Sequence, residues 1–116
     1  MEEIKPFQVD RPWGNFRQFT LNDASTVKIL TIKPGEELSK QSHAKRSEFC
    51  HVIHGSGSME IGENKFNVTE GDEHSVPVNT KHRVTAGPEG LTYVEISTGT
   101  FEENDEVRYE DKYGRA

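Results

Sequence analysis

Residues Gly35–Gly55 read GEELSKQSHAKRSEFCHVIHG, and the spacing of polar and apolar side chains in this stretch predicts two short strands joined by a tight loop. Successive side chains of a strand point to opposite faces, so Gln41 and His43 share a face of the first strand. By the same alternation, Glu48 shares a face of the second strand with His54. An amide oxygen, an imidazole and a carboxylate therefore converge, and all three are ligands for divalent metal ions.

A second segment, Gly71–His82, reads GDEHSVPVNTKH and supplies a further imidazole. The two segments together predict a four-ligand site for one divalent ion. Such a mixture of imidazole, carboxylate and amide suits Zn, Mn, Fe, Co or Ni and does not distinguish among them.

The rest of the chain alternates short stretches rich in β-branched and aromatic residues with turn residues, without a sustained helical period. This pattern predicts an all-β fold, an antiparallel sandwich or a closed barrel. Turns are expected at Arg11–Gly14 and Gly55–Gly57, and a loop is expected at Ala86–Gly90. The expected strands are Phe16–Thr20, Ser25–Lys33, Ser58–Ile61, Phe66–Thr69, Ser75–Pro77, His82–Ala86 and Leu91–Thr98.

The 116 residues contain no repeat, low-complexity tract or linker, so we expect one domain over residues 1–116. Residues 1–10 are polar and predict an N-terminal arm or edge strand. Residues 102–116 form a charged C-terminal tail, in which the chain has its only candidate for a helix or irregular cap. Trp13, the single tryptophan, is expected to be a packing anchor that closes one end of the core.

A formal net charge of −6 argues against general binding to nucleic acid or to anionic membranes. No apolar run approaches the roughly 18 residues that a membrane span needs. Cys50 is the only cysteine, which favours a reducing, cytoplasmic location. Basic residues nevertheless flank the proposed metal ligands. We therefore expect a small anionic ligand and take Lys40, Lys45 and Lys81 as candidate substrate-binding residues.

Two motifs resemble those of the cupin superfamily of small jelly-roll barrels. The first runs from Gly35 through Gln41-x-His43 and Glu48 to Gly55, and the second runs from Gly71 through Pro77-x-Asn79 to His82. A narrower resemblance covers nearly the whole chain and is to the C-terminal isomerase domain of type II phosphomannose isomerases, which usually follows a mannose-1-phosphate guanylyltransferase domain. It is carried by Arg11-Pro-Trp-Gly14, Lys33-Pro-Gly35, Arg46-Ser-Glu48, Lys81-His82-Arg83, Val107–Asp111 and Tyr113-Gly-Arg115.

The resemblance implies a cupin-type jelly-roll barrel, here as a stand-alone isomerase module, and a homodimer. It implies metal ligation by Gln41, His43, Glu48 and His82, with Arg46 in the active site. The implied reaction is the isomerisation of mannose 6-phosphate to fructose 6-phosphate through a metal-stabilised enediolate.

Strand alternation agrees with the active-site role that the resemblance implies for Arg46, and it offers a candidate base. Arg46 shares its face with Glu48 and is suited to hold a phosphate or an anionic intermediate. His54 also shares that face and is the candidate base.

The chain departs from the family pattern beside the proposed substrate site. Ala44 and Lys45 stand where histidines are common, and Phe49 and Cys50 stand where a His-Trp pair is common. The changes at Ala44, Lys45 and Cys50 keep open the alternative of a non-catalytic metal- and sugar-binding cupin. A third alternative is a small metal-dependent oxygenase, although such enzymes usually use histidine-rich or two-histidine-one-carboxylate iron sites and Gln41 counts against it.

Overall fold

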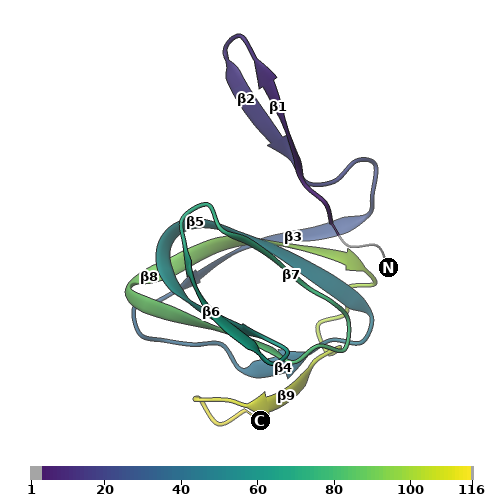
Figure 1. The fold of residues 1–116 in the computed structure, drawn as a ribbon. Coiled ribbons are helices and arrows are strands. Elements are labelled where there is room, and N and C mark those ends of the chain that lie inside the picture. The colour runs from purple at the N-terminus through teal and green to yellow at the C-terminus, as the bar shows by residue number, and fades with distance from the viewer. Residues whose placement is uncertain (1–3, 116) are drawn as a thin grey trace.

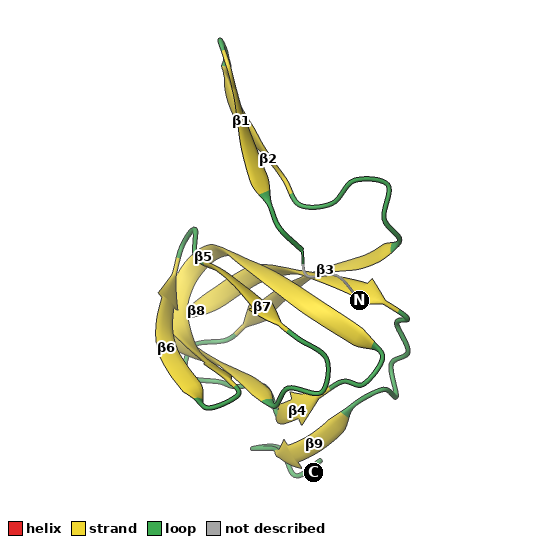
Figure 2. Cartoon of the chain, turned by 45° about the vertical axis from the view of Figure 1, so that its right-hand side comes forward, coloured by secondary structure: helices red, strands yellow, loops and turns green. Residues whose placement is uncertain are grey.

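The computed structural model describes residues 4–115, so residues 1–3 of the expected arm and residue 116 of the expected tail lie outside the described part. Between residues 4 and 115 the chain forms strands and no helix, which confirms the all-β prediction (Figure 2). No helix long and apolar enough to cross a membrane occurs among these residues. The strands are β1 (Phe7–Arg11), β2 (Gly14–Gln18), β3 (Ser25–Ile32), β4 (Lys40–Ser42), β5 (Arg46–Ile61), β6 (Asn64–Thr69), β7 (Glu73–Val76), β8 (His82–Gly99) and β9 (Val107–Glu110).

Two long antiparallel strands, β5 and β8, form the frame of the barrel. Their ladder runs from the pair Arg46↔Gly99 to the pair Ile61↔His82. Strands β6 and β7 also pair with β5, whereas β3 and β4 pair with β8. Figure 1 shows β5 and β8 curving so that the strands wrap around a common interior.

The bends in the frame occur at glycines. The ladder between β5 and β8 shifts register between Val52 and His54 and again between Gly55 and Gly57. A Cβ atom on Gly55 would lie 2.1 Å from the carbonyl oxygen of Gly90, because the two strands approach very closely there. The predictions of a turn at Gly55–Gly57 and a loop at Ala86–Gly90 were therefore wrong. Glycine permits a bulge in a continuous strand as readily as a turn.

The apolar core fills the interior between the bent strands. Val52 is fully buried, and Leu91, Tyr93, Met59 and Val68 are at most 2% exposed. Burying a side chain of this size contributes roughly 1.5–3 kcal/mol each. The core therefore holds the two halves of β5 and β8 against each other, and it packs behind the polar end described below.

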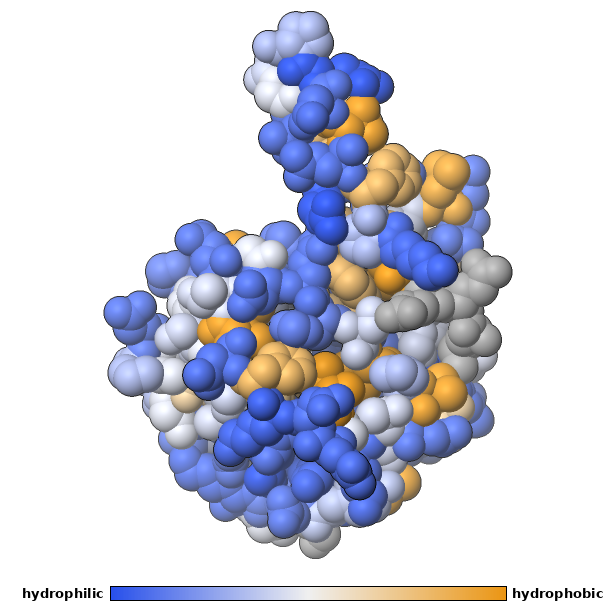
Figure 3. Space-filling model, in the orientation of Figure 1, coloured by the Kyte–Doolittle hydropathy of each residue, from blue (hydrophilic) through white to orange (hydrophobic). Residues whose placement is uncertain are grey.

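A hairpin of β1 and β2 projects from the barrel, as Figures 1 and 3 show. Trp13 lies at its turn and is 73% exposed, so the prediction that Trp13 anchors the core was wrong. One attachment to the barrel is an ion pair, in which Arg17 Nε lies 2.7 Å from Glu73 Oε2. The same carboxylate oxygen lies 2.8 Å from His51 Nδ1, and the bond from Arg17 is the main cause that lowers the pKa of Glu73.

The C-terminal segment crosses the end of the barrel at β4. Strand β9 pairs with β4, with Lys40 opposite Glu110 and Ser42 opposite Val107. The tail therefore contains a strand in place of a helix. The irregular residues 100–106 before β9 pass next to the loop that joins β4 to β5, where Thr100 N donates to Lys45 O at 3.1 Å.

Candidate functional site

Three buried side chains from different strands meet at this end of the barrel. His43 follows β4, Glu48 lies in β5 and His82 begins β8. Glu48 Oε1 lies 3.4 Å from His43 Nε2 and 3.2 Å from His82 Nε2. One ligand atom from each residue lies within 4.8 Å of the other two, which is the spacing of a shared metal ion. Each residue is at most 7% exposed.

Both imidazoles are held at their far nitrogen by a backbone carbonyl. His43 Nδ1 lies 2.7 Å from the carbonyl oxygen of Asp105, and His82 Nδ1 lies 2.9 Å from that of Thr80. A carbonyl only accepts hydrogen bonds, so each neutral ring carries its proton on Nδ1. The lone pair of each Nε2 then points toward Glu48, as a metal ligand requires.

The fourth predicted ligand, Gln41, lies in β4 and pairs in register with His82. Its side chain is half-buried and lines the same cavity as the three residues above. The chemistry of this donor set fits a borderline divalent ion, because it combines two neutral imidazoles with one carboxylate and an amide oxygen.

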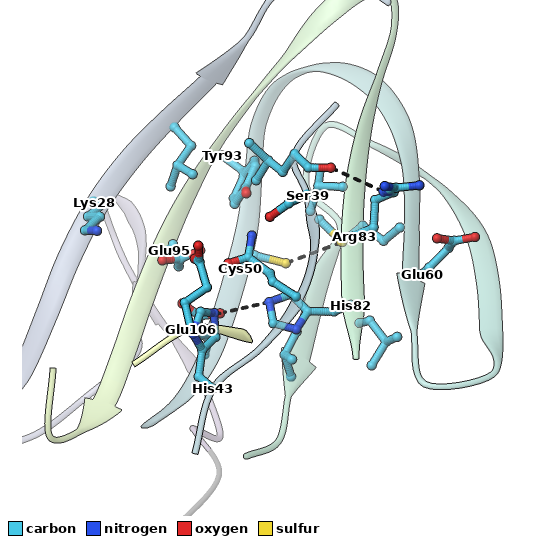
Figure 4. Close-up of a pocket in the computed structure, with 18 of the residues that line it drawn as sticks. Lys28, Ser39, His43, Cys50, Glu60, His82, Arg83, Tyr93, Glu95 and Glu106 are labelled. Carbon is cyan, nitrogen blue, oxygen red and sulfur yellow. Dashed lines mark hydrogen bonds and ion pairs between the residues drawn. The ribbon is translucent and has the colours of Figure 1, made fainter. Parts of the chain in front are cut away.

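The cavity has a volume of about 220 Å³ and is lined by both apolar and charged residues. Figure 4 shows His43, His82, Glu95, Cys50 and Tyr93 around this space. Alongside five acidic side chains, the wall carries five basic ones. The basic residues are Lys28, Arg46, Arg83, Arg108 and Arg115.

Arg46 lies directly against the three residues and is only 6% exposed. Its Nε lies 3.4 Å from Glu48 Oε2, and its Nη2 lies 3.4 Å from His43 Nε2. Its Nη1 donates to the carbonyl oxygen of Glu102 at 3.1 Å, and the ring of Phe101 lies 4.4 Å from the guanidinium carbon. A fixed, desolvated guanidinium thus faces the cavity and can pair with an anion.

Two carboxyl groups of the site interact, and their pKa values move apart. Burial and the charge of Glu48 raise the pKa of Glu95 above its ordinary value. Burial alone would raise the pKa of Glu48, but its close contacts with His82, Glu95 and His43 lower that pKa to about 2. Glu48 is therefore the ionised member of the pair, as a metal ligand must be.

Cys50 also lies on the cavity wall and is buried. Burial raises the pKa of its thiol to about 12, so the group is neither a nucleophile nor a ready metal ligand at neutral pH.

Several residues predicted from the sequence do not reach the cavity. His54 is exposed, because the bulge after Val52 breaks the alternation that aligned it with Glu48. Lys45 is exposed and pairs with Glu102 at 2.9 Å. Lys81 lies over the ring of Tyr109 at 4.4 Å, and Lys40 is half-buried in β4 without lining the cavity.

The sequence motifs did not identify some residues of the site, although strand alternation could have located two of them. Lys28 and Glu95 are opposite each other in the β3–β8 ladder, on the inner face that also carries Leu30 and Tyr93. The alternation of polar and apolar residues in these strands would have placed both on the inner face. The contact from the backbone carbonyl of Asp105 could not be predicted in this way, because a backbone contact is independent of side-chain type.

Comparison with known proteins gives a match to the model of one family, described as mannose-6-phosphate isomerase C-terminal, over residues 2–111. The mannose-1-phosphate guanylyltransferase of Salmonella montevideo is 37% identical over 117 residues, which covers 98% of this chain and 25% of that protein. The chain spans about a quarter of the length of the curated relatives it matches.

Solved structures with the same architecture include the capsular polysaccharide assembling protein CapF of Staphylococcus aureus. The TM-score is 0.68 at 18% identity, and the match covers 92% of this chain and 35% of CapF. Bacillus subtilis oxalate decarboxylase, a protein with Mn(II) centres, matches with a TM-score of 0.63 at 25% identity over 75% of this chain and 24% of that chain. These likenesses confirm the prediction of a cupin-type barrel.

Proposed function

Because the chain belongs to the family of mannose-6-phosphate isomerase C-terminal domains, we propose that it is a metal-dependent sugar-phosphate isomerase that interconverts mannose 6-phosphate and fructose 6-phosphate. The observation that carries this proposal is the group of His43, Glu48 and His82, with both Nε2 atoms turned toward the carboxylate in the wall of a cavity that the buried Arg46 also lines.

The proposed metal ligands are Gln41, His43, Glu48 and His82. A divalent ion held there would polarise a sugar carbonyl and stabilise the negative charge that develops on its oxygen. The Mn(II) centres of oxalate decarboxylase make Mn(II) the first ion to test, followed by Zn, Co, Ni and Fe.

The proposed substrate is a small anionic sugar. Arg46 is fixed by Glu48 and by the carbonyl of Glu102, so little side-chain freedom is lost when it binds an anion. Lys28, Arg83 and Arg108 bring further positive charge to the wall of the cavity. We assign anion binding to these residues in place of Lys40, Lys45 and Lys81, which do not line the cavity.

Interconversion of an aldose and a ketose moves a proton between neighbouring carbon atoms, which needs a group inside the cavity. His54 is exposed outside it. Glu95 lines the cavity beside Glu48 without belonging to the ligand group, so we assign the proton transfer to its carboxyl group. Glu95→Gln keeps the shape of the side chain and is expected to abolish turnover while metal binding persists.

A second candidate function is a non-catalytic metal- and sugar-binding cupin. Many cations at the site are already paired with acids of the same chain. Arg83 pairs with Glu110 at 3.3 Å and Arg108 with Glu106 at 2.6 Å, and such pairs compete with an anionic substrate.

The test is a coupled assay of mannose 6-phosphate conversion, with metal-stripped protein resupplied with each ion in turn. His82→Ala is the variant, and His74→Ala is its matched control, because His74 packs on Phe66 outside the cavity. Metal-dependent turnover that is lost only in His82→Ala supports the isomerase. Stoichiometric metal binding without turnover favours the binding protein, and absence of metal binding refutes both.

We also propose a homodimer, as the resemblance implies. Phe49 of β5 is a candidate interface residue by strand alternation, but it is 5% exposed and packs on Phe19 of the same chain with ring centroids 5.9 Å apart, so it is not available to a partner. Sedimentation equilibrium of the purified protein tests the dimer directly, and a monomer at all concentrations refutes it.

A further inference from the structure

We propose that Asp105 is a positioning residue for the metal site: it ties the C-terminal segment to the loop after β4 and thereby holds His43 in the tautomer that can bind a metal ion. This inference rests on the proposed metal site, but its first consequence concerns the metal-free protein and can be measured independently.

The backbone carbonyl of Asp105 sets the proton position of His43. It lies 2.7 Å from Nδ1 of a ring that is only 5% exposed, and it can only accept. Without this acceptor, the Nδ1–H form of His43 would be supported only by the longer contact of 3.4 Å from Arg46 Nη2 to Nε2. The alternative tautomer places its proton on Nε2, where it would block metal binding and leave Arg46 Nη2 without an acceptor.

The carboxylate of Asp105 holds that carbonyl in place. Its Oδ1 accepts the backbone N–H of Ala44 at 3.0 Å, and its Oδ2 accepts the N–H of Lys45 at 2.9 Å. These are the two amides that follow His43 in the chain. The bond from Ala44 is the largest cause that lowers the pKa of Asp105, so the charged form is the one that makes these contacts.

Neighbouring contacts join the same two segments. Lys45 Nζ lies 2.9 Å from Glu102 Oε2, and Arg46 Nη1 donates to the carbonyl oxygen of Glu102 at 3.1 Å. Asp105 is nevertheless the residue of this segment that contacts both the ring of His43 and the backbone directly after it. Its removal therefore releases the ring and the loop together.

The two histidines differ in how far their supports lie along the chain. His82 bonds to the carbonyl of Thr80, two residues before it, so its own loop orients it. His43 depends on Asp105, 62 residues later. Loss of the Asp105 carboxylate should therefore disturb His43 and leave His82 unchanged. A general loss of stability would not produce this selectivity.

The test compares Asp105→Ala and Asp105→Asn with the wild type. Metal affinity, measured by competition with a chromophoric chelator using Mn(II) and Zn(II), should fall about 10- to 100-fold in Asp105→Ala, the usual range for partners of ligand histidines. The metal affinity of Asp105→Asn should lie between those of the wild type and Asp105→Ala, because the asparagine amide has one oxygen for two N–H groups. Asp72→Ala is the matched control: it removes a carboxylate that accepts the backbone N–H of Thr69 at 2.8 Å, away from the cavity.

The second readout is the ¹⁵N spectrum of histidine-labelled, metal-free protein, with circular dichroism to establish that each variant is folded. Wild type should show Nδ1–H tautomers for His43 and His82, and Asp105→Ala should lose that signature at His43 alone. An unchanged His43 signal, or affinity equal to that of Asp72→Ala, would overturn the inference. If the wild type binds no metal, the proposed function fails, and the spectrum of metal-free His43 still decides the role of Asp105.

Discussion

Substituting Gly55 by alanine should destabilise the barrel far more than the same change at Gly71, although both glycines have positive φ. The φ angles are +87° and +90°, so each alanine incurs a similar backbone strain of about 1–2 kcal/mol. Only Gly55 is crowded. A Cβ atom there would lie 2.1 Å from Gly90 O and 3.2 Å from Leu91 Cα, whereas nothing lies within 4 Å of one on Gly71.

The overlap at Gly55 involves backbone, so β5 and β8 must separate by roughly 1 Å to relieve it, and overpacking of this kind costs about 1–3 kcal/mol or more. Gly55→Ala should therefore lose roughly 2–5 kcal/mol in total and Gly71→Ala about 1–2 kcal/mol. Urea unfolding followed by far-ultraviolet circular dichroism gives both values. Equal losses in the two variants would refute the close approach of the strands as the reason for glycine at position 55.

Three further outcomes follow from burial and charge. The pKa of Glu48 is lowered in the folded, metal-free protein, which gives a stabilising contribution that is fully present above the ordinary carboxyl pKa of 4.5. This contribution is lost as the pH falls toward the folded-state pKa of about 2. Thermal unfolding across acidic pH measures the loss, and Glu48→Gln should make the unfolding temperature less dependent on pH. Burial raises the pKa of Cys50 to about 12, so a thiol reagent should label it only after unfolding, and prompt labelling of native protein would contradict this. Leu91→Ala should cost about 2–5 kcal/mol in chemical unfolding because Leu91 is 1% exposed, whereas Leu21→Ala, at 68% exposure, should change stability by about 0.5 kcal/mol or less.

The sequence allowed the strands near the site to be predicted because alternation is regular there. Gln41 and His43 flank one buried serine, and Glu48 lies in an unbroken part of the β5 ladder. The same rule misplaced His54, since the bulge at Val52 adds a residue that no local pattern reveals. Gly55 and Gly57 were wrongly predicted to form a turn for a related reason. Both glycines allow β8 to pack closely against β5, and β8 is too far away in sequence for a local pattern to reveal this contact.

Other features depend on contacts that composition does not encode. The hairpin that carries Trp13 stands away from the barrel, whereas a lone aromatic residue beside a proline turn usually packs on a core. The charged tail is typical of a surface segment, yet it contributes β9 and the Asp105 carbonyl to the site. Strand alternation could have predicted that Lys28 and Glu95 face the interior, but both residues lie outside the two metal-binding motifs.

The exposure of Trp13 determines which optical methods can follow this protein. Its indole is 73% in solvent on a hairpin that projects from the barrel, so its fluorescence in the native state should already resemble that of an unfolded chain. Emission spectra recorded during unfolding or metal titration should therefore change little even when the barrel opens completely. Tyr93, at 2% exposure on the cavity wall, is the natural chromophore for those events. Tryptophan emission that stays unchanged during unfolding therefore reflects the exposed position of Trp13 on the hairpin and does not show that the core is intact.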